Sequence, residues 1–400
     1  MDRRAFLTRS MALGCSAAAS PWLTPIALAD APWDNRLVVI ILRGAMDGLD
    51  VFRPLGDPDY AALRPTLNDG QGLSLDNFWA LHPALSPLLP LWQAGEVGAV
   101  HAVSTPYRNR SHFDGQDLLE AGGTQLDGSV RDGWLNRLLQ TVPGLQAETA
   151  YAIGVEQMAI LTGNAPAARW SPGTRLRLSE QAQRLLDVVY HDDPLFQQAS
   201  AQAIAIAAQV TADAATDDAM TETMAADPMM AAVNDRGVSS NLAKFAAARL
   251  RGTTRIASFS INGWDSHLNQ VNQLGRALGE LSDVILTLRA GLGPVWNQTA
   301  VLCLTEFGRT ARENGTVGTD HGTGGAMLFA GGAMKGGQVL GRWPGLSQQA
   351  LFENRDLMPT QDVRAMAGWV MRGLLGVDRS AIEGSIFPGL DLGDDPGLLL

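Results

Sequence analysis

The sequence predicts an α/β fold with a doubly wound, mainly parallel sheet. Short apolar runs alternate along the chain with longer segments of helical periodicity, which is the pattern of strands buried between two helical layers. Polar and charged residues collect beside the ends of these runs, where parallel sheets place their ligand-binding loops. Residues 30–400 are therefore expected to form one large α/β domain.

The first 29 residues have the pattern of a twin-arginine export signal. The chain begins MDRRAFL, continues through an uncharged, Ala-rich stretch and reaches ALA at 27–29, a small-x-small cleavage site. The stretch is too short for a permanent membrane span. Cleavage after Ala29 is expected, which makes the twin-arginine translocase a partner during export and the mature protein periplasmic or secreted. Lipidation at Cys15, in the segment ALGC, is the alternative.

The chain is acidic, with 30 Lys and Arg against 41 Asp and Glu and a net charge of −11. The signal contains three arginines and one aspartate, so its removal leaves −13. This balance argues against non-specific binding to nucleic acid or to an anionic membrane. Removal of Cys15 leaves Cys303 alone, without an internal disulfide. Cys303 lies in the apolar run AVLCL and is predicted to be a core residue rather than a nucleophile.

Five apolar runs are predicted strands because each is short and almost uncharged, as a strand covered on both faces requires. They are 37–42 (LVVIIL), 97–103 (VGAVHAV), 255–261 (RIASFSI), 299–304 (TAVLCL) and 326–330 (AMLFA). A weaker strand is expected near 151–155.

Helices are expected between these strands. Residues 83–94 carry leucines at helical spacing, while 112–121 and 270–290 begin directly after polar loops. A last helix is predicted over 362–375, followed by a coil that contains FPGL.

Residues 179–250 differ from the rest of the chain. They are rich in Ala, Gln and Met and contain no glycine before Gly237. With no convincing strand pattern, this segment is predicted to be a helical insertion in the α/β domain.

Polar clusters stand beside five of the predicted strands. Four follow a strand and one precedes the last strand: RGAMDG at 43–48, STPYRNRSHFD at 104–114, NGWDSH at 262–267, TEFGRT at 305–310 and TDHGTG at 319–324. Because such clusters meet at one edge of a parallel sheet, they predict a binding site there.

Carboxylates and imidazoles in these clusters are the usual ligands of divalent metals. The candidate ligands are Asp47, Asp265, His267, Glu306, Asp320 and His321. Asp265 and His267 are two residues apart, so an extended backbone places both on one side. Asp320 and His321 are adjacent, so one can bind a metal while the other orients it. Zinc is the first expectation for the metal, with manganese and calcium as alternatives.

Ser111 and His112 stand at the start of the helix predicted over 112–121. A hydroxyl at a helix N-terminus lies near backbone N–H groups that stabilise a transferred phosphate or sulfate. The alternative is that Ser111 only caps the helix. His112 is a candidate ligand or base, or else a hydrogen-bonded structural histidine.

Arginines also occur in these clusters of an otherwise acidic chain. They are Arg43, Arg108, Arg110 and Arg309. Guanidinium groups bind phosphate and sulfate through paired hydrogen bonds, and Arg43 and Arg309 are the candidates for holding a substrate anion. The alternative is that each arginine pairs with a neighbouring carboxylate.

Together these motifs resemble the exported bacterial family known as domain of unknown function 1501. The resemblance covers nearly the whole mature chain and is carried by LRGAMDGL at 42–49, RSHFD at 110–114, GWDSH at 263–267, EFGRT at 306–310, DHGTG at 320–324 and AGGAMKGG at 330–337.

The family looks like a divergent branch of the alkaline phosphatase and sulfatase superfamily. The resemblance implies that Asp47 is a metal ligand, Ser111 the nucleophile, Asp265 with His267 the middle ligand pair, and His321 the last metal histidine. Glu306 falls where the superfamily has an Asp-His dipeptide, and Phe307 stands in place of that histidine. One expected ligand is therefore missing.

The first functional expectation is an exported metal-dependent hydrolase of phosphate or sulfate esters, with a small anionic ester or glycan as substrate. The alternative is a non-catalytic binding or assembly protein on a degenerate phosphatase-like fold, which the missing histidine at Phe307 favours. A purely structural envelope protein is the third possibility, but it leaves the Asp, Glu and His residues at the strand ends unexplained.

Overall fold

The computed structural model of the protein describes residues 31–126, 128, 130–172 and 235–400. The expected signal and its cleavage site, and residues 179–234 of the expected insertion, lie outside the described residues.

A central sheet organises the described part of the chain. Its strand order is β11-β5-β10-β9-β1-β8-β6-β7, with β12 also beside β5. The strands are β1 (Arg36–Leu42), β5 (Val97–Ser104), β6 (Ala150–Ile153), β7 (Ala168–Trp170), β8 (Ile256–Ile261), β9 (Thr299–Leu304), β10 (Gly325–Ala330), β11 (Val339–Leu340) and β12 (Gln361–Asp362). Only β10 runs antiparallel to its neighbours, so the predicted mainly parallel α/β fold is confirmed.

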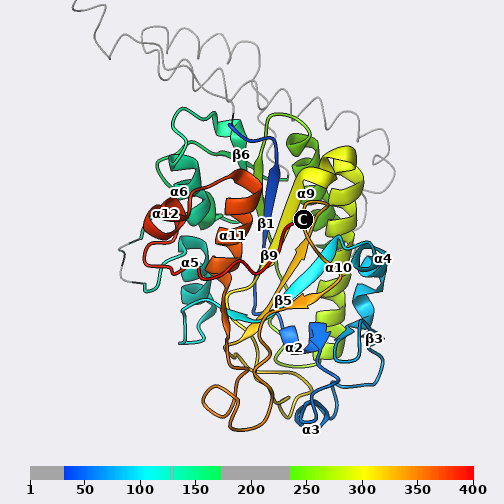
Figure 1. The fold of residues 1–400 in the computed structure, drawn as a ribbon. Helices are drawn as coiled ribbons and strands as arrows, with labels where there is room; N and C mark the ends of the chain where they lie inside the picture. The colour runs from blue at the N-terminus through cyan, green and yellow to red at the C-terminus, as the bar shows by residue number, and fades with distance from the viewer. Residues whose placement is uncertain (1–30, 127, 129, 173–234) are drawn as a thin grey trace, which may run out of the picture.

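Helices cover both faces of this sheet (Figure 1). One face carries the 3-10 helix η1 (Pro83–Leu88), α4 (Leu89–Gln93), α9 (Asp235–Leu250) and α10 (Gln270–Leu292). The other carries α5 (His112–Ala121), α6 (Trp134–Gln140), α11 (Val363–Leu375), α12 (Arg379–Ala381) and the π-helical turn η7 (Ile382–Ile386).

Alternate residues of β1 face the two layers. Val38, Ile40 and Leu42 pack in the core with α9 and α10, whereas Leu37, Val39 and Ile41 pack in the core with α6 and α11. Because side chains of a strand alternate between faces, a continuous apolar run is what such a doubly covered strand needs.

Smaller elements lie outside the two layers. A second sheet has the order β2-β4-β3. These elements are α2 (Gly48–Val51), β2 (Phe52–Arg53), α3 (Tyr60–Leu63), β3 (Leu73–Ser74), β4 (Ala80–Leu81) and the 3-10 helices η2 (Ala147–Thr149), η3 (Ala159–Leu161) and η6 (Gly293–Gln298).

The predicted elements agree closely with these bounds. The strand predicted over 299–304 and the helix predicted over 112–121 coincide with β9 and α5. The helix predicted over 83–94 is divided into η1 and α4, with Pro87 inside η1 and Pro90 near the start of α4. Part of the expected insertion forms α9, and Leu242 and Ala246 of α9 belong to the main core. Among the described residues, no helix has the length and apolar character needed to cross a bilayer.

One edge of the sheet collects the predicted polar clusters. The carboxyl ends of β1, β5, β8 and β9 lie there because these strands are mutually parallel. β10 is antiparallel, so its beginning lies at the same edge. The loop before β10 therefore meets the loops that follow the four other strands.

Candidate metal centre

Three histidines and one aspartate converge at this edge: His112, Asp265, His267 and His321, which we call the His/Asp cluster. His267 Nε2 lies 2.8 Å from His321 Nε2. Asp265 Oδ1 lies 3.2 Å from His267 Nε2 and 3.5 Å from His321 Nε2, and Asp265 Oδ2 lies 3.5 Å from His112 Nε2. His112, Asp265 and His321, from three separate loops, thus offer ligand atoms that all lie within 4.8 Å of one another, and His267 lies beside Asp265 and His321.

The other ring nitrogen of each histidine, Nδ1, is held by an acceptor. Glu306 Oε1 lies 2.8 Å from Nδ1 of His112. Asp320 Oδ1 lies 3.2 Å from Nδ1 of His267. The Arg110 carbonyl oxygen lies 2.8 Å from Nδ1 of His321. A carbonyl and an ionised carboxylate can only accept, so each Nδ1 carries the proton. The Nε2 atom of each neutral ring therefore presents a lone pair to the cluster.

This arrangement leaves lone pairs facing one another. His112 Nε2 is buried and has no hydrogen-bond partner within the described residues. Protonation of all three rings would place like charges close together and so be unfavourable. The ring centroid of His321 lies 4.2 Å from that of His112 and 4.6 Å from that of His267. A single divalent cation held by His112, Asp265 and His321 would satisfy these three side chains at once.

The distances suit a small cation. Ligands at zinc–nitrogen distance in a tetrahedron lie about 3.3 Å apart, and the four contacts in the cluster span 2.8–3.5 Å. Histidines anchored through Nδ1 by carboxylates or carbonyls are also the usual arrangement around a bound metal. The residues present therefore fit a divalent metal with imidazole and carboxylate ligands.

The pKa values of the cluster reflect its surroundings. The hydrogen bond to Glu306 raises the pKa of His112 above its ordinary value, more than burial lowers it. Burial lowers the pKa of His321. Burial also opposes ionisation of Asp265, but the hydrogen bond and charge of Arg309 outweigh it and lower the pKa of Asp265. Near neutral pH, Asp265 is therefore anionic and His321 neutral, the states that bind a cation.

Arg309 lies behind Asp265 rather than in an anion site. Its Nη2 donates to Asp265 Oδ1 at 2.6 Å, and the guanidinium also donates to the carbonyl oxygens of Gly44, Ala45 and Thr319. Arg309 is 1% exposed. It therefore orients the carboxylate and ties three loops together, whereas its expected role was to hold a substrate anion.

Glu306 and Asp320, two of the expected ligands, occupy orienting positions. Glu306 is fully buried, and its Oε1 accepts from His112, from the Gly44 N–H and from Gln116. Burial opposes its ionisation, but the hydrogen bonds from His112 and Gln116 outweigh it and lower the pKa of Glu306. Asp320 holds His267 in the equivalent way.

Asp47, the expected first ligand, pairs with an arginine instead. Arg64 donates to both of its oxygens, at 2.7 and 3.1 Å, and both side chains are at most 1% exposed. Asp47 also caps α2 through Leu49 N–H. Its donor atoms are not in the group formed by His112, Asp265 and His321, which lie within 4.8 Å of one another.

Gln270 connects this buried ion pair to the loops of the cluster. Its Nε2 donates to Asp47 and Asp50 at 2.6 and 2.9 Å. Its Oε1 accepts from the hydroxyls of Ser266 and Thr319 at 3.0 and 2.7 Å. Ser266 precedes His267, and Thr319 precedes Asp320, so one fully buried amide joins both loops.

Ser111 is the N-cap residue of α5, but its side chain makes no capping hydrogen bond. Its chain neighbours both contribute to the cluster, through the Arg110 carbonyl and the His112 ring. The first intrahelical bond of α5 is donated by Gly115. The N–H groups of its first turn are therefore left for another acceptor.

The remaining arginines predicted to bind an anion are engaged by the protein. Arg43 donates to Gln116 and Glu120 and forms an ion pair with Glu156. Arg110 pairs with Asp356 and Glu353. Arg108 donates to the carbonyl oxygens of Thr105 and Tyr107. The guanidinium groups of these three arginines are thus bonded to other groups of the protein.

Phe307 occupies the space beside the histidines. Its ring stacks on His112, with centroids 5.1 Å apart, and lies 5.3 Å from the ring of His321. The residue is 2% exposed. It therefore forms an apolar wall of the cluster at the place where the superfamily pattern has an imidazole.

A comparison with protein-family models identifies the chain. The model described as a protein of unknown function (DUF1501) matches residues 82–370. The chain belongs to the DUF1501 family. The resemblance drawn from its motifs is thereby confirmed. A comparison with curated protein sequences finds no match.

Several solved structures resemble this DUF1501 protein at low identity. A protein in the alkaline phosphatase superfamily from Vibrio parahaemolyticus shows 11% identity and a TM-score of 0.39, covering 93% of this chain and 75% of the other. A 2-O GAG sulfatase shows 10% identity and a TM-score of 0.40, covering 86% of this chain and 71% of the other. The lipoteichoic acid synthase LtaP from Listeria monocytogenes shows 7% identity and a TM-score of 0.41, covering 94% of this chain and 80% of the other. With TM-scores below 0.5, no activity is transferred from them.

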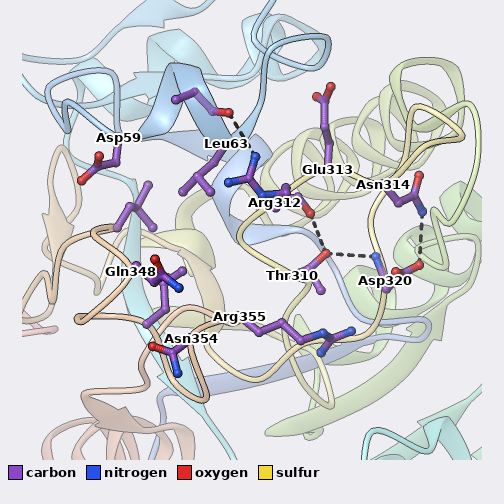
Figure 2. Close-up of a pocket in the computed structure, with 13 residues that line it drawn as sticks. Asp59, Leu63, Thr310, Arg312, Glu313, Asn314, Asp320, Gln348, Asn354 and Arg355 are labelled. Carbon is purple, nitrogen blue, oxygen red and sulfur yellow. Dashed lines mark hydrogen bonds between the residues drawn. The ribbon is translucent and has the colours of Figure 1, made fainter.

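Two pockets flank the cluster of the DUF1501 protein. One has a volume of about 660 Å³ and includes His112, Phe113, Arg43 and Glu156 in its lining. The other, of about 530 Å³, includes Asp320, Thr310 and Arg355 (Figure 2). The cluster thus has a pocket on its His112 side and another on its Asp320 side.

Sequence reasoning missed four residues of this region: Arg64, Gln270, Arg312 and Arg355. Gln270 stands three residues after His267, and Arg312 three residues after Arg309, so proximity to the motifs is a signal for these two. Arg64 and Arg355 reach the site from distant loops, and nothing in their local sequence marks them.

Proposed function

We propose that this DUF1501 protein binds a divalent metal, zinc in the first place, at the His/Asp cluster and hydrolyses phosphate or sulfate esters there. The observation that carries the proposal is the close group formed by Asp265 and the Nδ1-anchored His112 and His321, with His267 beside it. A bound metal would neutralise charge that develops on the ester during hydrolysis.

The chain supplies the remaining groups beside the cluster. Ser111 offers a hydroxyl without a capping bond at the start of α5, in the place of a nucleophile. The unpaired N–H groups of the first turn of α5 lie where they would bind an oxyanion. In this proposal these N–H groups bind the substrate anion, which was the role expected for Arg43 and Arg309. The guanidinium groups of both arginines are bonded to other groups of the protein.

We further propose that residues 1–29 direct export through the twin-arginine pathway, with the mature protein periplasmic or secreted. The support is the motif MDRRAFL followed by an apolar stretch and ALA. Such a route carries folded proteins, which suits a protein that binds its metal before it crosses the membrane.

Metal analysis of the purified mature protein tests the site. About one equivalent of a divalent metal is expected in the wild type, and Asp265→Ala and His321→Ala should each lose it. Asp391→Ala, which removes an exposed carboxylate near the C-terminus, is the matched control. A folded wild-type protein that binds no added zinc, manganese or calcium would contradict the site.

Turnover of aryl phosphate and aryl sulfate esters tests the reaction. Metal-loaded wild type should hydrolyse one class, and Ser111→Ala should reduce turnover by at least about a hundredfold without loss of metal. Full metal occupancy with no turnover of either ester would instead support the non-catalytic binding protein.

A further inference from the structure

We propose that the pocket lined by Arg312 and Arg355 binds a non-reacting part of the substrate, and that this part is a sugar or polyol with a second anionic group. The inference rests on the proposed function and names the substrate class for the same site. The pocket has a volume of about 530 Å³, within the range of small-molecule binding sites.

The pocket adjoins the His/Asp cluster through two of its lining residues. Asp320 holds His267 by its carboxylate. Arg355 Nη1 donates to the His321 carbonyl oxygen at 2.8 Å and to Asp356 at 2.9 Å. A molecule in this pocket therefore lies next to the loop that carries both Asp320 and His321.

Arg312 and Arg355 differ from the other arginines of this region. Arg43, Arg110 and Arg309 pair with carboxylates through two or three guanidinium nitrogens bonded within the protein, whereas Arg355 pairs with Asp356 through Nη1 alone. Arg312 makes one long contact, 3.5 Å to the Ala62 carbonyl oxygen, and the bonds of Arg355 use only its Nη1. Both side chains thus keep N–H donors for a ligand in a pocket beside the cluster.

Figure 2 shows these two guanidinium groups on either side of Thr310 in the pocket wall. Guanidinium N–H groups suit sulfate, phosphate or carboxylate through paired hydrogen bonds. Two arginines with free donors in one pocket therefore point to an anionic group on the ligand, in addition to the ester at the cluster.

The lining also carries three carboxylates, and two of them are hydrogen-bonded within the protein. Glu313 accepts from the backbone N–H groups of Thr66 and Leu67, and Asp320 accepts from His267 and Asn314. Asp59 is the lining carboxylate that makes no hydrogen bond in the described structure.

The other lining groups match a polyhydroxylated ligand. Asn354 and Gln348 carry amides that both donate and accept, Asp59 accepts, and each can pair with a sugar hydroxyl. Leu63 and Leu351 add an apolar portion of the wall for ring C–H groups. The lining therefore combines sugar-type polar contacts with two cationic groups.

Calorimetric binding of sucrose octasulfate to metal-free protein tests this pocket without any turnover. Wild type should bind, Arg312→Gln and Arg355→Gln should each weaken binding about tenfold, and the double variant should weaken it further. Arg251→Gln is the matched control because Arg251 is exposed at the end of α9, just before β8 begins and so at the opposite edge of the sheet. Uncharged sucrose should bind far more weakly.

Equal affinity of wild type and the double variant for the octasulfate, or no binding by wild type, would overturn the proposal. If wild type bound sucrose as tightly as sucrose octasulfate, the requirement for an anionic group on the ligand would be overturned. Loss of metal binding or turnover would count against the proposed function alone, because this titration uses neither. With an active ester, Arg312→Gln should raise KM more for a substrate with a second anion than for the same ester without one.

Discussion

At the scale of single residues, the ordering of the histidines decides what the cluster can do. An imidazole can present either ring nitrogen, and its partner at the other nitrogen determines which. In the described structure His112, His267 and His321 all give Nδ1 to an acceptor and turn Nε2 inward. Glu306 and Asp320, expected as ligands, act instead on the direction of two of these rings.

Glu306→Gln should therefore weaken metal binding while the protein stays folded. The amide keeps the shape of the side chain but holds the His112 Nδ1 proton less strongly, and such changes typically cost about 10- to 100-fold in metal affinity. Competition with a chromophoric chelator measures the change in Kd. Glu383→Gln, which alters an acid paired with Arg379, is the control, and unchanged affinity in Glu306→Gln would show that the carboxylate does not orient His112.

His101 should make the stability of the protein depend on pH. Burial lowers the pKa of His101 from 6.5 to about 4, so below pH 6.5 the unfolded chain binds a proton that the folded chain does not. The contribution of neutral, buried His101 to the free energy of unfolding is fully present above pH 6.5, and it is lost progressively as the pH falls toward 4. The free energy of unfolding should drop by about 2 kcal/mol between roughly pH 7.5 and pH 5 on this account.

Urea unfolding at these two pH values, on wild type and His101→Gln, measures this contribution. Gln can still donate to the Gly48 carbonyl and accept from the Ala102 N–H, as His101 does. Histidines elsewhere titrate in both proteins, so the difference between the two pH dependences isolates His101. An equally steep loss in His101→Gln would refute the assignment.

At the scale of elements, the site depends on where strands end. The loops after β8 and before β10 bring Asp265, His267 and His321 together, because β10 runs antiparallel to β9 in the central sheet. Gln270, at the start of α10, then ties these loops to Asp47. The first-strand aspartate thus supports the cluster through Gln270 rather than as a ligand.

Gln270→Leu should destabilise the protein and weaken metal binding together. The substitution leaves two carboxylates and two hydroxyls with fewer partners in a fully buried place, and a cost of about 2–4 kcal/mol in the free energy of unfolding is expected. Asn272→Leu, on the exposed side of the same helix, is the control. Urea unfolding and zinc titration measure both effects, and normal zinc affinity in a folded Gln270→Leu protein would contradict the link to the loops.

At the scale of the whole molecule, the two helical layers form a rigid support and leave the chemistry to one edge. The apolar strands of the sheet are buried on both faces, and the polar groups that they exclude collect where the strands end. For residues 1–29 we propose a second whole-molecule property, the route by which the protein is exported.

Replacement of both Arg3 and Arg4 by lysine should block export, because the paired arginines are the feature that distinguishes this pathway. Fractionation of the expressing bacterium measures the periplasmic and secreted share of the protein. Replacement of Arg9 by lysine in the same segment is the control and should leave export intact. Unchanged export of the double variant would contradict the proposed twin-arginine route.

Much of the fold was predictable from sequence because burial acts on local composition. The apolar run 299–304 and the segment 112–121, which follows a polar loop, have the bounds of β9 and α5, and the polar clusters mark the edge that carries the candidate site. His112, Asp265, His267 and His321 were named among the candidates from their positions after or before strands.

Roles within the site were decided only by the tertiary structure. Whether a carboxylate is a ligand, an orienting group or half of an ion pair depends on which side chain meets it, and such partners come from distant segments. Arg64 meets Asp47, and Arg309 meets Asp265. The sequence by itself determined which residues gather at the edge, because their neighbours along the chain form the strands. Only the packing of separate loops determined which atoms face one another there, and hence which residues remain free to bind a metal or an anion.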